Sequence, residues 1–184
     1  MKKAACIVTI LLVLLLSFSE VPAIMVGLST EQLTKRSDWV ITGKIENVVS
    51  MWSDDGKHII SRATVIVHEV VRGKLDEDII VVEYLGGEVG GIGLRVSDVR
   101  PLKSGEELLF FLKLKLDPAK TRELSSSEAG GKIYYIVGGA QGQYVIDPAG
   151  IARKGGFSII GGQEVIENNI PVRTLIDKIQ GVEK

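Results

Sequence analysis

Residues 39–51 read WVITGKIENVVSM, and their regular alternation indicates the fold. Trp39, Ile41 and Ile45 stand at odd positions, whereas the positions between them are mostly polar. A period of two is typical of a strand with one face buried and the other in water. Gly43 interrupts the middle of this strand, and such a glycine indicates a bulge or a tight bend. A long strand with a bend predicts a sheet that curves into a barrel.

Further strand patterns follow along the chain. Residues 58–71 are rich in β-branched side chains, a shorter apolar run covers 79–85, and leucine and phenylalanine alternate with charged residues near 107–116. Two short runs, 133–137 and 143–146, predict a hairpin across a glycine-rich turn. The alternation also predicts that one core contains Ile41, Ile45, Leu108, Phe110 and Leu112.

Short helices are predicted before and after the strands. Ser29 can cap a first helix, with Gln32 three residues on as in a capping box. Near the C-terminus, Leu175 and Ile179 belong to an apolar stripe that Gly181 can terminate. The chain is therefore predicted to be mainly β: a small OB-like Greek-key barrel of about five strands with a short N-terminal helix and a C-terminal helix. A two-sheet sandwich is the alternative architecture.

The N-terminus has the order of a secretory signal peptide. Two lysines precede an uncharged aliphatic run, which ends at the cleavage pattern Val21-Pro22-Ala23. The run is shorter than the about 20 residues that span a bilayer, which favours cleavage over a retained anchor. We expect a signal peptide at 1–23 and a single β-barrel domain with a C-terminal helix at 24–184. The expected location is secreted or in the cell envelope.

Composition limits the partners of the chain. It has 184 residues, a formal net charge of −1 and 5% aromatic residues. A near-neutral chain is poorly suited to coating nucleic acid, and few aromatic rings argue against a base-stacking platform. The only cysteine, Cys6, lies in the predicted signal peptide, so the exported chain would carry no disulfide and no thiol nucleophile. We expect no nucleic-acid partner, and no membrane association after signal cleavage.

The sequence contains no recognisable catalytic or cofactor motif. His58 and His68 belong to one strand pattern and would lie about 30 Å apart, too far for one metal ion. Neither a serine-nucleophile elbow nor a phosphate-binding glycine loop occurs. We therefore expect no enzyme activity, no cofactor and no metal. A pair of carboxylates for glycoside hydrolysis stays open as an alternative, because any two acidic residues can meet in a fold.

Four short segments occur in a recognisable order: SDWVITGKI at 37–45, VVRG at 70–73, GGEVGG at 86–91 and KSGEELLFFL at 103–112. Together they resemble a broad group of exported bacterial and archaeal proteins of uncharacterised function. In architecture such chains are similar to the OB-like barrels of netrin-like and metalloproteinase-inhibitor modules. The resemblance implies the barrel fold and export. It supplies no catalytic residue, because those modules use cysteines that this chain lacks.

Two loops carry the candidate binding residues. Trp52 stands beside a polar turn, where a large aromatic side chain is hard to bury and often contacts a partner. The alternative is that Trp52 closes the open end of the barrel. The glycine-rich loop at 86–93 either contacts a ligand or only permits positive φ angles and a close strand crossing. The candidate binding residues are Trp52, Asp54, Gly86, Gly87, Glu88, Gly90 and Gly91.

These features predict a non-enzymatic exported module that binds a protein or a glycan in the cell envelope or outside the cell. One alternative is a cell-surface assembly subunit that pairs through strand edges, which an extended tail or an open groove would favour. The other is a hydrolase, which a cleft with two buried acids would favour. The sequence leaves the oligomeric state and the identity of the partner unknown.

Overall fold

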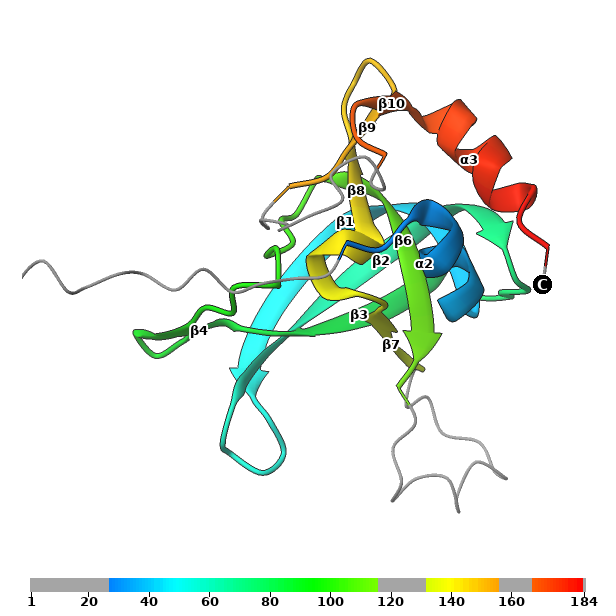
Figure 1. Ribbon diagram of the computed structural model, residues 1–184. Helices are drawn as coiled ribbons and strands as arrows, with labels where there is room; N and C mark the ends of the chain where they lie inside the picture. The colour runs from blue at the N-terminus through cyan, green and yellow to red at the C-terminus, as the bar shows by residue number, and fades with distance from the viewer. Residues whose placement is uncertain (1–26, 116–131, 156–166, 184) are drawn as a thin grey trace, which may run out of the picture.

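The chain forms a curved, mainly β structure with one helix before the strands and one after them (Figure 1). The computed structural model describes residues 27–115, 132–155 and 167–183, so the predicted signal peptide lies outside the described residues. The elements are α2 (Thr30–Arg36), β1 (Trp39–Trp52), β2 (Ile59–Arg72), β3 (Ile79–Leu85), β4 (Gly87–Val89), β5 (Ile92–Leu94), β6 (Glu107–Leu114), β7 (Ile133–Ile136), the 3-10 turn η1 (Gly139–Gly142), β8 (Gln143–Ile146), β9 (Ile151–Arg153), β10 (Ile170–Pro171) and α3 (Val172–Gln180).

The strands form one large sheet and one small one. The large sheet has eight strands in the order β1-β2-β3-β7-β6-β8-β9-β10, with an additional pairing between β1 and β6. Its pairs are antiparallel except for β3 and β7, which run parallel. Strands β4 and β5 form a separate two-stranded hairpin.

The predicted mainly β class with an N-terminal and a C-terminal helix is confirmed. The prediction of a small closed barrel of about five strands is wrong, because the sheet has eight strands and is not a closed barrel. The reason lies at β6, which pairs with β1 as well as with both β7 and β8. The sheet therefore continues from β6 through β8, β9 and β10 instead of ending there.

The bend predicted at Gly43 is present in β1. The register between β1 and β2 shifts there, and it shifts again between Ile45 and Asn47. A Cβ atom on Gly43 would lie 2.6 Å from the carbonyl oxygen of Ile66, so the close approach of the two strands requires glycine. Beyond the bend, β1 continues along β2 to Trp52, whereas its pairing with β6 ends at Lys44.

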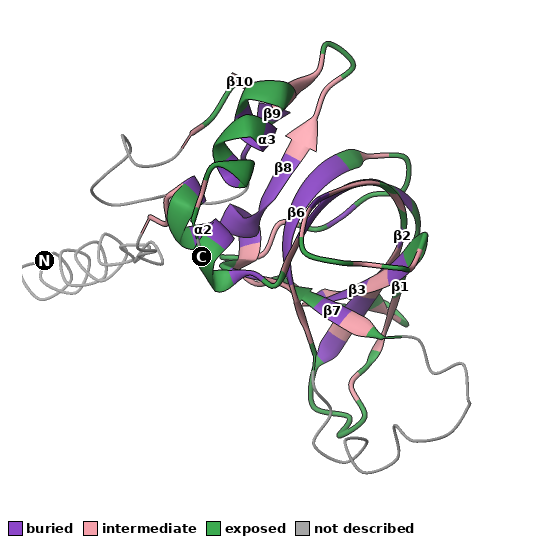
Figure 2. Cartoon of the chain, turned by 90° about the vertical axis from the view of Figure 1, so that its right-hand side faces the viewer, coloured by how far each residue is buried: buried purple, intermediate pink, exposed green. Residues whose placement is uncertain are grey.

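Two hydrophobic clusters lie on opposite faces of the sheet, and β6 contributes to both. Leu109 and Phe111 pack with both helices, whereas Phe110 packs into the other cluster, here called the interior cluster. The residues predicted to share a core do so in the interior cluster: Ile41, Ile45, Leu108, Phe110 and Leu112. Strand β6 is consequently buried along most of its length (Figure 2).

Both predicted helices form. The capping box of α2 is present: the Ser29 side chain accepts a hydrogen bond from the Gln32 backbone, and the Gln32 side chain accepts one from the Ser29 backbone. In α3, Leu175 and Ile179 are buried, and Gly181 follows the last turn. None of the helices in the described part of the chain is long and apolar enough to cross a membrane.

Three parts of the strand pattern differ from the prediction. The predicted hairpin of residues 133–137 and 143–146 is wrong, because β7 pairs with β3 and β6 while β8 pairs with β6 and β9. The glycine-rich loop at 86–93 is itself the β4–β5 hairpin. The short strands β9 and β10 were not predicted, because two or three residues carry no periodic signal.

Candidate functional site

Two grooves lie side by side at the end of β3. One, here called the β7 groove, has a volume of about 420 Å³. Its lining residues are Ile60, Glu83, Tyr84, Leu85, Val99, Lys115, Tyr135, Ile136, Gly139 and Gln143. The other, here called the β4 groove, has a volume of about 390 Å³. Its lining residues are Tyr84, Leu85, Gly86, Gly87, Glu88, Gly93, Leu94, Arg95, Val96, Val99 and Pro101. Both volumes fall in the range of small-ligand sites, about 300–1,000 Å³.

The β7 groove lies where β3 and β7 separate. Their parallel pairing covers only Val81–Glu83 on β3, after which β7 turns away into η1. The turn depends on glycine: Gly138 has φ 74°, and a Cβ on Gly142 would overlap the carbonyl oxygen of Val137. Next to this divergence, Leu85 is 39% exposed and Tyr135 is 41% exposed.

The loop from Arg95 to Gly105, which walls both grooves, is held in place by several contacts. The Leu102 backbone N–H donates to Tyr84 Oη over 3.3 Å, and the Ala140 N–H donates to the Asp98 carbonyl over 2.8 Å. Arg100 forms an ion pair with Glu106 at 2.6 Å, with both side chains mostly buried. The grooves therefore have a wall that is ordered before any ligand arrives.

The β7 groove contains a buried carboxylate between two cations. Glu83 is 7% exposed; its carboxylate accepts hydrogen bonds from Arg62 at 2.9 Å and from Lys115 at 2.5 Å. A buried charge needs such partners, because burial removes it from water. In the described ranges Glu83 is the only buried acid, so these residues do not contain the pair of buried acids that would favour a hydrolase.

Gln143 adds a polar atom to the same groove. The side chain is 2% exposed, and its Nε2 donates to the carbonyl oxygen of Arg100 over 3.1 Å. Its Oε1 accepts no hydrogen bond from any described residue. Leaving a buried amide oxygen without a hydrogen bond costs about 1–3 kcal/mol of stability. A ligand group that donates a hydrogen bond to this oxygen would therefore be bound more tightly.

The structure brings Trp52 and the glycine-rich loop to the same end of the sheet. Trp52 pairs with Ile59 on the neighbouring strand and is 44% exposed. The carbonyl oxygen of Ile59 in turn accepts a hydrogen bond from the Gly86 N–H over 2.8 Å. Trp52 and Gly86 are thus about two strand spacings apart, or about 10 Å.

The other predicted site residues divide into two groups. Gly87 and Glu88 line the β4 groove together with Gly86. Asp54 lies in the exposed turn after β1, and Gly90 and Gly91 form the exposed tip of the β4–β5 hairpin; none of the three lines either groove.

Gly87 also has a structural reason to be glycine. Its φ is +134°, and a Cβ there would lie 2.3 Å from Ser50 Oγ and 2.4 Å from Ser61 Oγ. These two serine hydroxyls are themselves hydrogen-bonded at 2.8 Å. The close packing of the hairpin on β1 and β2 therefore explains why position 87 is glycine. This agrees with the alternative prediction that the glycines of this loop permit positive φ angles and a close strand crossing.

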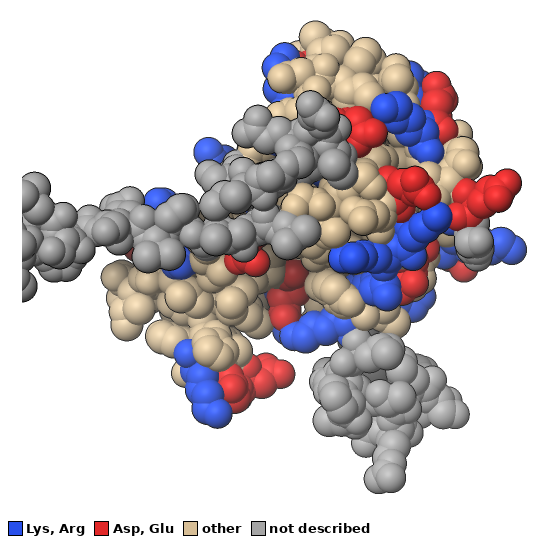
Figure 3. Space-filling model, in the orientation of Figure 1, with Lys and Arg blue, Asp and Glu red and all other residues tan. Residues whose placement is uncertain are grey.

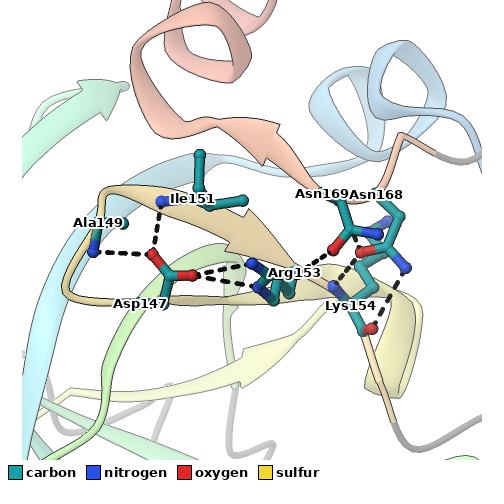
Figure 4. A network of polar contacts seen from close by, with 7 residues as sticks. All are labelled: Asp147, Ala149, Ile151, Arg153, Lys154, Asn168 and Asn169. Atoms are coloured by element: carbon teal, nitrogen blue, oxygen red, sulfur yellow. Dashed lines mark hydrogen bonds and ion pairs between the residues drawn. The ribbon is translucent and has the colours of Figure 1, made fainter.

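A second polar cluster lies away from the grooves, around β8 and β9 (Figure 4). The Asp147 carboxylate accepts hydrogen bonds from the Ile151 backbone and from Arg153. These bonds, the backbone one foremost, lower the pKa of Asp147 below its usual value. The Asn168 side chain is bonded to the Lys154 backbone, which fastens the chain before β10 to the end of β9.

The Lys154 side chain in this cluster is buried, and few contacts offset the loss of water around its ammonium group. It is 8% exposed, and its Nζ lies 4.4 Å from the centre of the Tyr144 ring. The Nζ has no hydrogen-bond partner among the described residues. Burial lowers the pKa of Lys154 to about 8, although the negative charge of Glu167 opposes the shift.

Charges on the surface are mixed in sign. Figure 3 shows lysine and arginine next to aspartate and glutamate, with uncharged areas elsewhere on the same face of the molecule. The described residues contain no cluster of three or more metal-ligating side chains. His68 Nδ1 instead lies 3.3 Å from Glu107 Oε1.

No protein-family model matches the chain, and no curated protein sequence matches it. The grooves, the exposed side chains and the charges are therefore the features that bear on function.

Proposed function

We propose that the protein is an exported, non-enzymatic binding module whose partner is a protein or a glycan. The partner contacts the end of the sheet that carries Trp52 and the two grooves. The observation that supports this most directly is the pair of adjoining grooves of ligand size, which lie at the same end of the sheet as the exposed side chain of Trp52. Binding sites are commonly concave surfaces formed by loops on a rigid sheet.

An OB-like relationship is part of the proposal. An OB-type barrel is a partly open five-stranded Greek-key structure that binds ligands through its second and third strands and the loop after its first strand. The pairings of β1, β2, β3, β7 and β6 support this relationship. The loop after β1 begins next to Trp52, and the grooves adjoin the end of β3.

Replacing Trp52 with Ala is expected to weaken partner binding by about 2 kcal/mol or more, which is a factor of about 30 in Kd. An aromatic side chain buries much area on binding at a small cost in conformational entropy. Because Trp52 is 44% exposed in the free protein, its replacement should cost less stability than that of a fully buried aromatic residue. Residues 24–184 would be immobilised to capture partners from envelope and extracellular fractions, and the captured partner titrated against both proteins.

Lys57→Ala is the matched control, since Lys57 belongs to the same turn and its side chain is 74% exposed. It should leave binding nearly unchanged. A large fall in the melting temperature of Trp52→Ala, with binding intact, would show that Trp52 closes the end of the sheet and that the site lies elsewhere.

Export of the chain makes its own prediction. The exported protein should begin at Ile24, because Val21-Pro22-Ala23 has the small residue that cleavage requires. Intact-mass analysis of protein from the medium and the envelope measures this directly. A full-length chain retained in the membrane fraction would contradict cleavage.

The grooves also favour a second candidate function, a cell-surface subunit that receives an extended segment from another copy. Sedimentation over a range of concentrations separates the two functions. A self-assembling subunit increases in mass with concentration, whereas a module for a different partner stays monomeric.

A further inference from the structure

Apolar side chains gather on the face of the sheet opposite the interior cluster. Residues paired across neighbouring strands point to the same face. The registers therefore align Val49, Arg62, Glu83, Tyr135 and Lys113 in one row across five strands. Neighbouring rows pair Ile60 with Leu85 and Ile66 with Ile79. This surface, here called the outer face, consists of Val49, Ile60, Arg62, Ile66, Ile79, Glu83, Leu85, Lys113, Lys115 and Tyr135.

The outer face is more apolar than the rest of the described surface. Of the seven exposed large hydrophobic residues, five lie on it, including Ile79 at 56% and Tyr135 at 41% exposure. Helices α2 and α3 cover the adjoining part of the sheet, where Leu109 and Phe111 are fully buried beneath them. A clustered apolar surface of this kind marks an interaction site more often than scattered apolar residues do.

The charges of the outer face favour a partner with acidic groups. Glu83 is the single carboxylate shared by Arg62 and Lys115, and Lys113 forms no ion pair with a described residue. In the row of Ile66 and Ile79, Lys44 is paired with Ile66 on one side and with Glu107 on the other, and the charges of Lys44 and Glu107 balance. The outer face therefore has an excess of two positive charges, although the whole chain carries −1.

The size of the outer face limits what can bind. The outer face is five strands wide and about six residues long, so it measures about 20 Å by 20 Å, or about 400 Å². A stable protein interface buries about 800 Å² on each partner, so this face fits a short segment better than a whole domain. The β7 groove opens at the edge of the outer face, and the two share Ile60, Glu83, Leu85, Lys115 and Tyr135.

We propose that the outer face binds a short protein segment that presents apolar side chains next to aspartate or glutamate. The inference rests on the proposed binding function and narrows the partner to a protein. A single exposed aromatic ring, that of Tyr135, provides little stacking surface for sugars, whereas aliphatic groups are buried best by apolar side chains. A second copy of this face would bring its excess positive charge against the same charge.

The test uses random linear peptides displayed on phage, selected against the exported chain. Enriched peptides should combine leucine, isoleucine, valine or phenylalanine with acidic residues. Synthetic versions should lose at least about tenfold in affinity between about 0.05 and 0.5 M salt, because ions screen exposed charges. Lys113→Glu and Ile79→Ser should each weaken binding by about tenfold or more.

Matched controls separate this inference from the proposed function. Lys74→Glu reverses an exposed charge away from the outer face, and Ile92→Ser removes a side chain as exposed as Ile79 but located on the β4–β5 hairpin. Both should bind the peptides as the unchanged protein does. The alternative result is that Trp52→Ala and Ile92→Ser abolish peptide binding while Ile79→Ser and Lys113→Glu do not. In that case the inference about the outer face is wrong, and a binding site at the Trp52 end of the sheet is supported.

Two further results would overturn the inference. One is that the enriched peptides lack acidic residues, or bind the Lys113→Glu and Ile79→Ser proteins unchanged. The other is that vesicles containing phosphatidylglycerol bind the protein, and lose that binding in Lys113→Glu, while no peptide is enriched. In that case the face contacts an anionic lipid surface.

Discussion

Replacing Phe110 with Ala is expected to lower the free energy of unfolding by about 3–5 kcal/mol. Phe110 has no exposed surface and lies in the interior cluster, between its cross-strand partners Ile41 and Gln143. Because β6 is paired along both edges, the surrounding strands cannot easily move inward to fill the cavity. Urea titrations of the two proteins, followed by circular dichroism, measure the difference.

His68→Ala is the control for this prediction, because His68 is exposed on its strand. Its stability should stay within about 0.5 kcal/mol of the unchanged protein. A loss below about 1 kcal/mol for Phe110→Ala would show that the face assignment of β6 is wrong.

Replacing Lys154 with Met is expected to stabilise the protein by about 2 kcal/mol near pH 7. Burial lowers the pKa of Lys154 from 10.5 to about 8, which corresponds to an unfavourable contribution of about 3 kcal/mol when the amine is charged. Loss of the contact with the Tyr144 ring offsets about 0.5–1 kcal/mol of the gain. Methionine has a similar shape and carries no charge that must leave water.

The pH dependence of this effect has a definite sign. Below about pH 8, Lys154 is charged in both the folded and the unfolded chain, so its burial carries the full cost. Between about pH 8 and pH 10.5 the folded chain binds fewer protons than the unfolded chain, so stability rises with pH. The advantage of Lys154→Met should therefore be complete near pH 7 and disappear by about pH 10.5.

Urea titrations at several pH values across this window give the difference between the two proteins. Lys74→Met, an exposed lysine, controls for loss of a positive charge and should show no such dependence. A destabilised Lys154→Met protein near pH 7, or a difference that does not change with pH, would contradict the prediction.

The local features of the fold could be predicted from the sequence. Alternation over residues 39–51 and 107–116 identified β1 and β6, because a half-buried strand requires a period of two. The capping box at Ser29 identified the start of α2 for an equally local reason.

The long-range pairing could not be predicted in the same way. The pairing of β3 with β7 joins Val82 to Tyr134 across 52 positions, and no periodic pattern records such a contact. The prediction of a closed barrel failed for a related reason, since the sequence of β6 does not reveal that both β7 and β8 lie along it.

The candidate site was predicted in part. Trp52 and Gly86 stood out as residue types and do lie at one end of the sheet. Tyr135 and Leu85 escaped notice, because each reads as an ordinary strand residue until the groove between their strands is known. A single sequence carries no signal that would have linked them.

The position of β6 between the two hydrophobic clusters also bears on how the protein unfolds. Its alternate side chains enter both clusters, so neither cluster can open while the other stays intact. The helices and the curved strands should therefore behave as one cooperative unit, in which the amide hydrogens of β6 exchange only through global opening. The β4–β5 hairpin beside the grooves contributes no residue to either cluster, so it can open locally while this cooperative unit stays intact.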